Sequence, residues 1–341
     1  MEQHIANLSE AQRRLGVPVI NIFNQGEPTG PAIRVLPRLD LSALRPASLR
    51  NLLFYALARR AVRSLDLASP TVFHVHGDYS DIFFARQLAR RLHAGVIAAS
   101  LHGALRENLP WLYRKALAHC ALVFATGKRE QLFLESVLER TVHHFPSAPG
   151  DNFFSSPSSP IAKTIDVVAV ANLFRNKRLD LLIECAAARP MYRFEVLGDG
   201  PERAPLERMV SNQGLNNITF RGLCSSEVVL AALQSSRVFV SLSESEGTPT
   251  SALEAMAAGL PVIMTPSNLY QWLIEDGRHG FVTKSWSVGE ILGYIDQIVT
   301  NDLLRQTMEE WAKHRARAET WERKARWITD LMSESLRTRP A

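Results

Sequence analysis

The chain has 341 residues, of which 46% are hydrophobic and 21% are charged, so it is long for one doubly wound domain and sufficient for two domains of about 150 residues each. No apolar run reaches the roughly 18 residues of a membrane-spanning helix and no apolar segment follows a basic start, so we expect a cytoplasmic protein without a transmembrane helix or a secretory signal. Residues 1–150 hold 18 Lys and Arg against 11 Asp and Glu, a net +7, and residues 151–341 hold 21 against 23, a net −2, which favours an anionic partner for the first half.

The first half alternates strand-like apolar runs with helical patterns, which is typical of α/β layering with parallel strands. Helices are predicted at residues 2–15, Leu49–Ser64 and Asp81–Leu92. The predicted strands are Val17–Phe23, Thr71–His76, Val96–Leu101, Leu122–Thr126 and Val142–Phe145. The Ser- and Pro-rich segment Ser147–Pro160 then indicates a linker between two domains.

A second α/β series follows the linker. Its predicted strands are Ile165–Ala171, Arg193–Leu197, Ile218–Arg221, Val238–Leu242, Pro261–Thr265 and Gly280–Thr283. The last stretch, Asp302–Arg337, is predicted as one amphipathic helix with Trp311, Trp321 and Trp327 as packing residues. The pattern therefore predicts two α/β domains with a cleft between them.

The segment Val238–Ile263 (VFVSLSESEGTPTSALEAMAAGLPVI) carries the most informative pattern in the sequence. It predicts a strand, a polar loop and a helix of about ten residues. Thr248 is predicted to cap that helix and Pro249 to lie in its first turn, whereas Gly259 is predicted to end it. The start of the helix then lies at the carboxyl edge of a parallel sheet, where such sheets bind ligands.

This helix start and the carboxylates around it predict a sugar-nucleotide site. The backbone N–H groups of Thr250 and Ser251, at the positive end of the helix dipole, are expected to receive a diphosphate. A phosphate repels a carboxylate, so Glu246 and Glu254 are expected to face neutral hydroxyl groups such as those of sugars. We assign Glu254 to a ribose diol and Glu246 to a transferred hexose, each hydrogen bond contributing roughly 1.5–3 kcal/mol.

The sequence EGTPTSALEAMAAGLPV, in which seven residues separate Glu246 from Glu254, resembles the signature of the family 4 (group 1) retaining glycosyltransferases. The resemblance implies the GT-B fold, in which two Rossmann-like doubly wound domains face a cleft and a C-terminal helix crosses back to the first domain. It also places Gly247, Thr248, Thr250 and Ser251 at the donor. The expected parts are residues 1–156 for the acceptor, 157–312 for the nucleotide-sugar donor and 313–341 for the returning helix.

The resemblance is strong over residues 165–285. The stretch VAVANLFRNKRLDLLIECA is similar to the family's strand, basic loop and helix, which implies that Lys177 holds the donor diphosphate. The usual Arg position holds Asn172, and Arg175 is the candidate to supply the missing charge. The stretches FEVLGDGP and ITFRGL also match family segments near the donor, so Gly198 and Leu223 are predicted donor-binding residues, Leu223 against the base.

In the family, the first domain supplies a His or Asp near the reacting carbon. The stretch IAASLHG predicts a strand ending in a His-Gly that looks like the family's, so His102 is predicted to hydrogen-bond the donor sugar; a satisfied structural histidine is the alternative. In the family a strand and a glycine-rich loop also precede the helix of residues 2–15. Because the first strand of a doubly wound sheet is central, we expect Met1 to be an internal methionine of a longer reading frame.

No metal site is predicted. His74 and His76 alternate on a strand and point to the same side, but we expect no third ligand nearby. Cys120, Cys185 and Cys224 follow no metal-ligand spacing and are expected to be buried thiols in a reducing compartment, without disulfides. There is no Asp-x-Asp, so nothing indicates a divalent ion on the diphosphate.

Arginines gather on two predicted helices of the first half: Arg50, Arg59, Arg60 and Arg63 on one, and Arg86, Arg90 and Arg91 on the next. A basic helix with an apolar face can lie on anionic lipid, so peripheral binding to the inner face of the cytoplasmic membrane, or an anionic lipid-linked acceptor, is one interpretation. A solvated face over a core stripe is the other. Nucleic acid is not expected, because no stretch interleaves aromatic and basic residues.

The resemblance implies a retaining, metal-independent hexosyltransferase that moves a sugar from a nucleotide-diphosphate sugar to a carbohydrate or lipid-linked acceptor hydroxyl, in cell-surface polysaccharide or lipopolysaccharide biosynthesis, with no other cofactor. Three alternatives remain. Asn172 and the short start favour a catalytically inactive GT-B protein that binds a nucleotide sugar or serves as a scaffold. A nicotinamide-dependent oxidoreductase is disfavoured because no strand leads into G-x-G-x-x-G, and an epimerase because the paired glutamates belong to the transferases.

Overall fold

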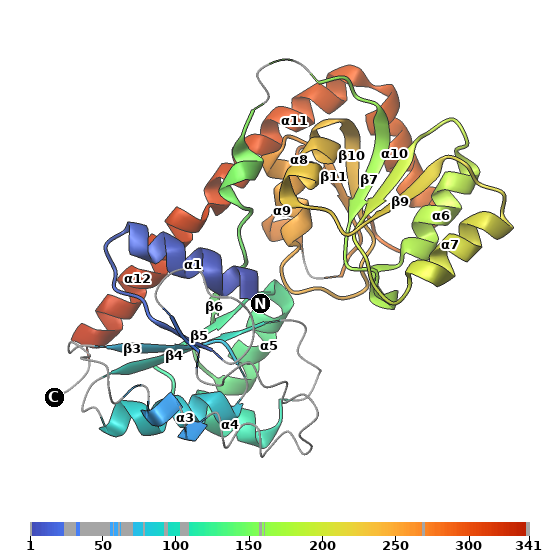
Figure 1. The fold of residues 1–341 in the computed structure, drawn as a ribbon. Coiled ribbons are helices and arrows are strands. Elements are labelled where there is room, and N and C mark those ends of the chain that lie inside the picture. Colours follow the sequence, from blue (N-terminus) through green and yellow to red (C-terminus); the bar gives the residue numbers. More distant parts are fainter. Residues whose placement is uncertain are drawn as a thin grey trace. The chain divides into compact units, whose positions relative to one another are not determined.

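The computed structural model describes residues 2–23, 32–34, 55–56, 58–60, 62, 71–77, 79–91, 95–102, 109–156, 159, 161–267 and 270–338. The chain forms two compact units (Figure 1). Unit 1 comprises Met1–Thr126, Glu130–Phe145 and Trp321–Ala341, and unit 2 comprises Gly127–Arg129 and Pro146–Thr320. Each has a parallel sheet covered by helices, which confirms the predicted α/β fold class with two Rossmann-like domains.

Among the described residues of unit 1, the main sheet has four parallel strands in sequential order, β3 (Val72–Val75), β4 (Val96–Leu101), β5 (Leu122–Ala125) and β6 (His143–His144). β1 (Asn21–Phe23) and β2 (Ala32–Arg34) form a separate parallel pair. The predicted strand Val17–Phe23 is therefore paired only over its last residues, and β2 was not predicted. Pro18 explains the shortening, because proline has no N–H to give to a ladder.

Helices cover both faces of the unit 1 sheet. α3 (Tyr79–Arg91), α4 (Trp111–Leu117) and α5 (Lys128–Leu138) share one apolar core with alternate residues of β4 and β5. α1 (Glu2–Arg14) packs along α12 (Trp321–Arg337), and α12 contacts β4. The amide of Gln12 donates to Thr329 Oγ1 (3.3 Å) across these two helices. The C-terminal helix therefore returns to the first domain, as predicted.

The sheet of unit 2 has six parallel strands in the order β12-β11-β10-β7-β8-β9. β7 and β10 are central, and the chain proceeds from them to opposite edges, which is the doubly wound arrangement. All six predicted strands are present, within two residues of their predicted limits. They are β7 (Ile165–Val170), β8 (Phe194–Leu197), β9 (Ile218–Gly222), β10 (Ser236–Ser241), β11 (Val262–Met264) and β12 (Gly280–Val282).

Both faces of this sheet are buried. On one face lie α6 (Leu179–Ala188), α7 (Arg203–Asn212) and α10 (Val288–Thr300), and on the other lie α8 (Ser226–Gln234), α9 (Thr250–Ala257) and α11 (Asp302–Ala316). Within β7, Val167 and Ala169 belong to the first core and Val168 to the second. Successive side chains of a strand point to opposite faces, so this double burial explains why the strands are continuously apolar.

The unit boundaries differ from the predicted divisions at 156/157 and 312/313. They fall after Phe145 and after Thr320, because the short helix η2 (Asp151–Phe154) buries Phe153 in a unit 2 core that also contains Ala316. The predicted single helix Asp302–Arg337 is interrupted by η5 (Arg317–Glu319) and by extended backbone at Thr320 (φ −80°, ψ 152°).

Other predictions concern single residues and segments. The three cysteines are free; Cys120 and Cys185 are buried, as predicted, whereas Cys224 is partly exposed. Burial raises the pKa of the Cys120 and Cys185 thiols to about 12. The tryptophans pack within their own units, for example Trp327 stacked on Phe145 with ring centres 5.8 Å apart. Much of the predicted helix Leu49–Ser64, with Arg50 and Arg63, lies outside the described residues. Among those described, no helix is both long enough and apolar enough to cross a membrane.

Candidate functional site

Two loops at the carboxyl ends of β7 and β10 bring the predicted charges together. Parallel sheets bind ligands where two neighbouring strands lead to opposite edges, and β7 and β10 are that pair in unit 2. The short helix η3 (Arg175–Lys177) follows β7, and the loop of residues 242–249 follows β10. Lys177 and Glu246, predicted from different parts of the sequence, therefore meet at one point of the sheet edge.

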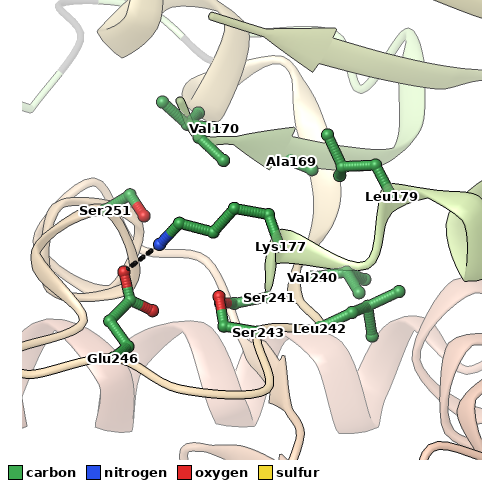
Figure 2. Close-up of a pocket in the computed structure, with 11 residues that line it drawn as sticks. Ala169, Val170, Lys177, Leu179, Val240, Ser241, Leu242, Ser243, Glu246 and Ser251 are labelled. Carbon is green, nitrogen blue, oxygen red and sulfur yellow. Dashed lines mark hydrogen bonds and ion pairs between the residues drawn. The ribbon is translucent and has the colours of Figure 1, made fainter. Parts of the chain in front are cut away.

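Lys177 and Glu246 form an ion pair in which Nζ lies 2.5 Å from Oε1 of Glu246 (Figure 2). Their side chains are only 17% and 16% exposed, so water screens the attraction less than in a surface pair. The pair places a cation and an anion within reach of the same ligand. A phosphate would compete with the carboxylate for the ammonium group, and sugar hydroxyls would compete with the ammonium for the carboxylate.

Hydrogen bonds between the two loops fix this pair. The side-chain amide of Asn176 donates to the Ser245 carbonyl (3.1 Å), and the Glu244 N–H donates to the Asn176 carbonyl (2.8 Å). Arg178 adopts a left-handed backbone conformation (φ +49°) and its Nη1 lies 2.8 Å from Oε1 of Glu244. Sequence analysis missed Asn176 and Arg178, because a single sequence carries no signal for a bond between two loops so far apart.

The start of α9 differs from its prediction. Pro249 precedes the helix without a side-chain cap, and Thr248 Oγ1 instead accepts a hydrogen bond from the Ser147 N–H (3.0 Å), so the predicted cap at Thr248 is wrong. The Thr250 N–H donates to the Thr248 carbonyl (2.9 Å) and is not available to an anion as predicted. Among the described residues, the N–H groups of Ser251 and Ala252 have no acceptor, so these two amides form the unpaired positive end of the helix.

The end of α9 follows its prediction. Gly259 has φ +89°, its N–H donates to the Met256 carbonyl (3.0 Å), and the Leu260 N–H donates to the Ala255 carbonyl (2.8 Å). This pair of bonds is the Schellman motif, which needs a residue that accepts a positive φ. The helix is therefore limited to one short segment whose start faces the pocket.

Glu254 is a half-buried carboxyl group without a partner. In the described part of the chain, no hydrogen bond or ion pair involves its side chain, and burial raises its pKa to about 7. A buried carboxylate that accepts hydrogen bonds is strongly stabilised in its charged form. A ligand with two neighbouring hydroxyl groups would supply that stabilisation.

A small pocket lies at this edge of the sheet (Figure 2). Of the predicted site residues, Lys177, Glu246 and Ser251 line it. Ser241 and Ser243 also line it and were missed, although their alternation at the end of β10 places both on one face of the strand. The remaining lining residues are Ala169, Val170, Ala171, Leu179, Val240 and Leu242.

The other predicted donor residues of unit 2 do not line the pocket. Asn172 and Arg175 are exposed, and Leu223, directly after β9, is 85% exposed. The backbone requires glycine at Gly198, because its φ is +127° and a Cβ there would lie 1.9 Å from the Ala171 carbonyl oxygen. The donor-binding roles of these residues, and of Gly247, stay predictions.

His102 lies in unit 1, directly after β4. Its Nε2 lies 2.8 Å from Nδ1 of His76, and burial lowers its pKa to about 4. His74 and His76 point to the same side, as predicted, with ring centres 4.0 Å apart. The prediction that no third metal ligand lies nearby is wrong, because His4 and His102 both approach His76. The role of His102 toward a donor sugar stays a prediction.

The sequence model of the family described as "Glycosyl transferases group 1" matches residues 152–315, which contain all of this pocket. The model described as "Glycosyltransferase Family 4" matches residues 1–147. Together they account for both units except the returning helix. The chain belongs to the family 4 (group 1) glycosyltransferases, and its fold is GT-B.

Individual proteins agree with this assignment. The chain is 31% identical over 179 residues to the lipopolysaccharide core biosynthesis glycosyltransferase LpsE of Rhizobium meliloti, an alignment that covers 51% of this chain and 50% of that protein. The chain therefore spans about half the length of this curated relative. In fold it is similar to sucrose-phosphate synthase from Thermosynechococcus elongatus (TM-score 0.79, 18% identity, 97% and 92% of the two chains). It is also similar to Anabaena HepE in complex with UDP and glucose (TM-score 0.77, 16% identity, 98% and 95%).

Proposed function

We propose that the protein transfers a sugar from a nucleotide-diphosphate sugar to the hydroxyl group of an acceptor. The observation that carries this proposal is the arrangement at the start of α9. An ion pair (Lys177–Glu246), two backbone N–H groups (Ser251 and Ala252) and an unpartnered carboxyl group (Glu254) lie along one edge of the unit 2 sheet. In the proposed complex the ion pair lies between the sugar and the diphosphate, the two N–H groups bind the diphosphate, and Glu254 binds the ribose.

Each group has one role in the proposed complex. Lys177 and the amides of Ser251 and Ala252 bind the diphosphate and stabilise the charge that develops on it as the sugar leaves. Glu246 turns from Lys177 to the hydroxyl groups of the sugar, and Glu254 accepts hydrogen bonds from the ribose diol. The binding energy of the two carboxylates orients the sugar for transfer.

We further propose that the anomeric configuration is retained and that no metal ion acts on the diphosphate. In the described residues of the pocket no side chain is placed as a covalent nucleophile: Glu246, the nearest carboxylate, is held by Lys177. The leaving phosphate would therefore help to deprotonate the acceptor on the same face, as the family resemblance implies. Lys177 and the helix start supply the positive charge that a metal ion supplies elsewhere. An α-linked product from an α-linked donor, with no rate increase on adding Mg²⁺ or Mn²⁺, is the expected result.

The names of the relatives support a proposal for the biological setting. LpsE is described by its name as an enzyme of lipopolysaccharide core biosynthesis, and HepE was solved with UDP and glucose. We therefore propose a UDP-sugar donor and a carbohydrate or lipid-linked acceptor of the cell surface, with the protein acting at the cytoplasmic side of the membrane.

Unit 1 offers support for peripheral membrane binding. Arg90 on α3 is exposed, and α4 presents Trp111, 68% exposed, with Lys115 Nζ 5.7 Å from its ring. Basic residues beside a tryptophan suit the interface of an anionic bilayer. Co-sedimentation with vesicles containing an anionic lipid tests this part, and absence of binding at low salt would remove it.

The direct test combines a thermal-shift screen of UDP-, GDP- and ADP-sugars with an assay of donor consumption by the full chain. We expect the UDP-sugars to raise the Tm, and one of them to be consumed when an acceptor glycan is added. Glu254→Gln should abolish most of the shift. Binding without consumption for every donor and acceptor tried would favour an inactive nucleotide-sugar-binding protein instead.

A further inference from the structure

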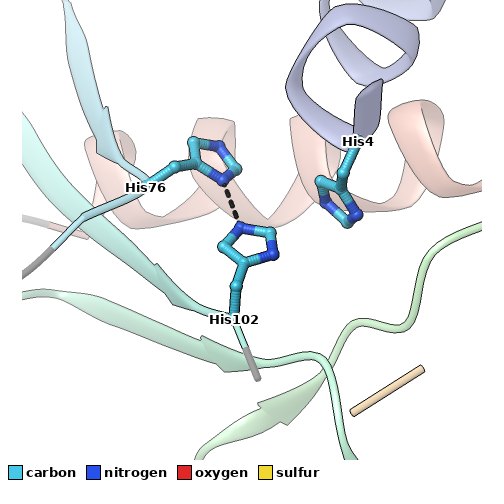
Figure 3. Close-up of side chains that lie close together, drawn as sticks. All are labelled: His4, His76 and His102. Carbon is cyan, nitrogen blue, oxygen red and sulfur yellow. Dashed lines mark hydrogen bonds between the residues drawn. The ribbon is translucent and has the colours of Figure 1, made fainter. Parts of the chain in front are cut away.

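We propose that His4, His76 and His102 form a binding site for a zinc-like divalent cation that joins α1 to the ends of β3 and β4. The three imidazoles come from three separate elements of unit 1 and converge (Figure 3). Each offers one ring nitrogen, and these three nitrogens all lie within 4.8 Å of one another. Three imidazoles with a fourth, open position are a known arrangement for zinc.

The pairing of β3 with β4 explains why these side chains lie close together. β3 and β4 are parallel neighbours, and His76 and His102 are the residues directly after Val75 and Leu101, at which these strands end. Both side chains therefore lie at the carboxyl edge of the sheet. His4, in the first turn of α1, is 4% exposed and lies over them, with its ring centre 4.7 Å from that of His102.

The 2.8 Å contact between His76 Nδ1 and His102 Nε2 requires a hydrogen atom between the two nitrogens. Two lone pairs cannot face each other at that distance, so one of the two nitrogens carries a hydrogen that the other accepts. A cation between the rings removes this requirement, because each nitrogen then directs its lone pair at the metal. The displaced proton moves to the far nitrogen of the same ring, so binding needs a change of tautomer and no net loss of a proton.

The chemistry of the ligating atoms determines which cation the site would bind. All three are imidazole nitrogens, which suit zinc and its first-row neighbours, whereas Mg²⁺ and Ca²⁺ prefer oxygen. Metal-binding imidazoles must be neutral, and burial lowers the pKa of each of the three well below neutrality. Zn–N bonds of roughly 2.0–2.1 Å separate tetrahedral ligand nitrogens by about 3.3 Å, so the site closes by small rotations of the rings.

The surroundings are those of a shielded site. His74 lies against His76, with its Nε2 2.7 Å from Ser100 Oγ, and so limits the tilt of the His76 ring. Trp321 and Phe145 pack edge-on to His4, with ring centres 4.9 and 5.5 Å away. Lys324, buried on α12, adds positive charge near His4, which favours an anion such as hydroxide or chloride at the fourth position of the metal.

Apart from His102, for which a contact with the donor sugar is predicted, this site shares no residue with the donor pocket of unit 2. The proposed transfer uses no metal on the diphosphate, and the cation of unit 1 would act by cross-linking three elements of the fold. The expected effect of the cation is therefore on stability, because a ligand that binds only the folded chain raises the Tm, and raises it more the tighter it binds. A test with the metal alone is independent of sugar transfer, so either proposal can fail without the other.

The experiment uses the full chain, freed of metal with a chelator and titrated with ZnCl₂ or CoCl₂. We expect one equivalent to bind, the Tm to rise, and Co²⁺ to give the visible absorption of a tetrahedral site. His76→Gln and His4→Gln should each weaken Zn²⁺ binding by at least about tenfold, whereas His119→Gln, elsewhere in unit 1, should not.

His102→Gln, at a partly exposed position after β4, keeps the test open if the other variants fold poorly. Unchanged Zn²⁺ affinity in His102→Gln, or Co²⁺ binding without a tetrahedral spectrum, would overturn the proposal. The cluster would then be a hydrogen-bonded part of the unit 1 core.

Discussion

Unit 2 keeps the titratable groups at its sheet edge charged by pairing most of them, whereas unit 1 keeps its own neutral by burying them. Around the pocket of unit 2, Lys177 is paired with Glu246 and Arg178 with Glu244. At the corresponding edge of unit 1, burial lowers the pKa of His74 to about 3 and that of His102 to about 4. Both edges are carboxyl ends of parallel strands, where ligands of α/β proteins bind.

This difference between paired and buried groups indicates which ligand each sheet edge can bind. Paired charges can exchange one partner for a ligand group of the same sign, so unit 2 suits a molecule that carries both an anion and neutral hydroxyl groups. Neutral imidazoles attract no anion and instead offer lone pairs to a cation. Glu254 is the exception in unit 2, a carboxyl group that burial holds near neutrality. Variants in unit 2 should therefore alter donor use and leave Zn²⁺ binding unchanged.

The largest expected effect is that of Lys177→Met. Loss of the cation removes stabilisation of the leaving diphosphate and should lower kcat/KM by about 10²–10³. Lys163→Met is the matched control, because Lys163 is also a partly buried lysine of unit 2, paired with Glu309 at 3.4 Å but located before β7. Steady-state kinetics of both variants checks this. A loss of similar size in the control would assign the effect to stability.

Glu246→Gln should separate turnover from nucleotide binding. Turnover should fall by about 10- to 100-fold, because the carboxylate contacts the transferred sugar in the proposed complex. The affinity for UDP itself should stay the same or increase, because Lys177 loses its competing partner. Calorimetry with UDP and kinetics with the donor measure the two effects, and Glu244→Gln, in the same loop, is the control. Equal losses in both measurements would refute the placement of Glu246 on the sugar.

Glu254 should give sugar-nucleotide binding a pH dependence of about tenfold. Its pKa of about 7 means that the ionised fraction rises about tenfold between pH 6 and pH 8, and the ribose hydroxyls bind the ionised form. An intact sugar nucleotide must be the probe, because free UDP has a phosphate that titrates near pH 6. The affinity should increase with pH in the native chain and be flat in Glu254→Gln. A flat profile in both would contradict this role.

The same group should lower stability at high pH. Its pKa in the fold lies above the ordinary value of 4.5, so its ionisation opposes folding; this cost is absent below pH 4.5 and complete above about pH 7. Glu254→Gln should therefore raise the free energy of unfolding at pH 8 by up to about 3 kcal/mol and change it little at pH 4.5. Urea unfolding at the two pH values measures the difference.

Arg175→Gln should have the smallest effect. The side chain is exposed, does not line the pocket and forms no ion pair within the described residues, so donor affinity should change by less than about fivefold. Measured beside Lys177→Met, the variant shows whether Arg175 supplies the charge missing at Asn172. A loss as large as that of Lys177→Met would place Arg175 on the diphosphate.

The sequence predicted the parts of the molecule that depend on local pattern. The six strands of unit 2, the end of α9 at Gly259 and the presence of Lys177 and Glu246 in one site follow from apolar periodicity, a positive φ and a family motif. The sequence did not predict the acceptor of the Thr250 N–H, the loop-to-loop bonds of Asn176, or the approach of His4 to His76. These depend on contacts between distant segments, which leave no periodic signal in one chain. Thr248 was misassigned because a Ser/Thr before a helix usually caps it, and here the Ser147 N–H uses its oxygen instead.

The pairing of α1 with α12 has a consequence for how the protein is made. Gln12 and Thr329 are 317 positions apart, and unit 1 needs both helices, whereas Pro146–Thr320 of unit 2 is one continuous segment. Domains generally fold as units while the ribosome is still adding residues, and long-range contacts form late. Unit 2 can therefore fold during synthesis. Unit 1 cannot complete its fold until α12 has left the ribosome, and one face of its sheet stays uncovered until then. Unit 1, most of which is synthesised before unit 2, should therefore become protease-resistant after unit 2.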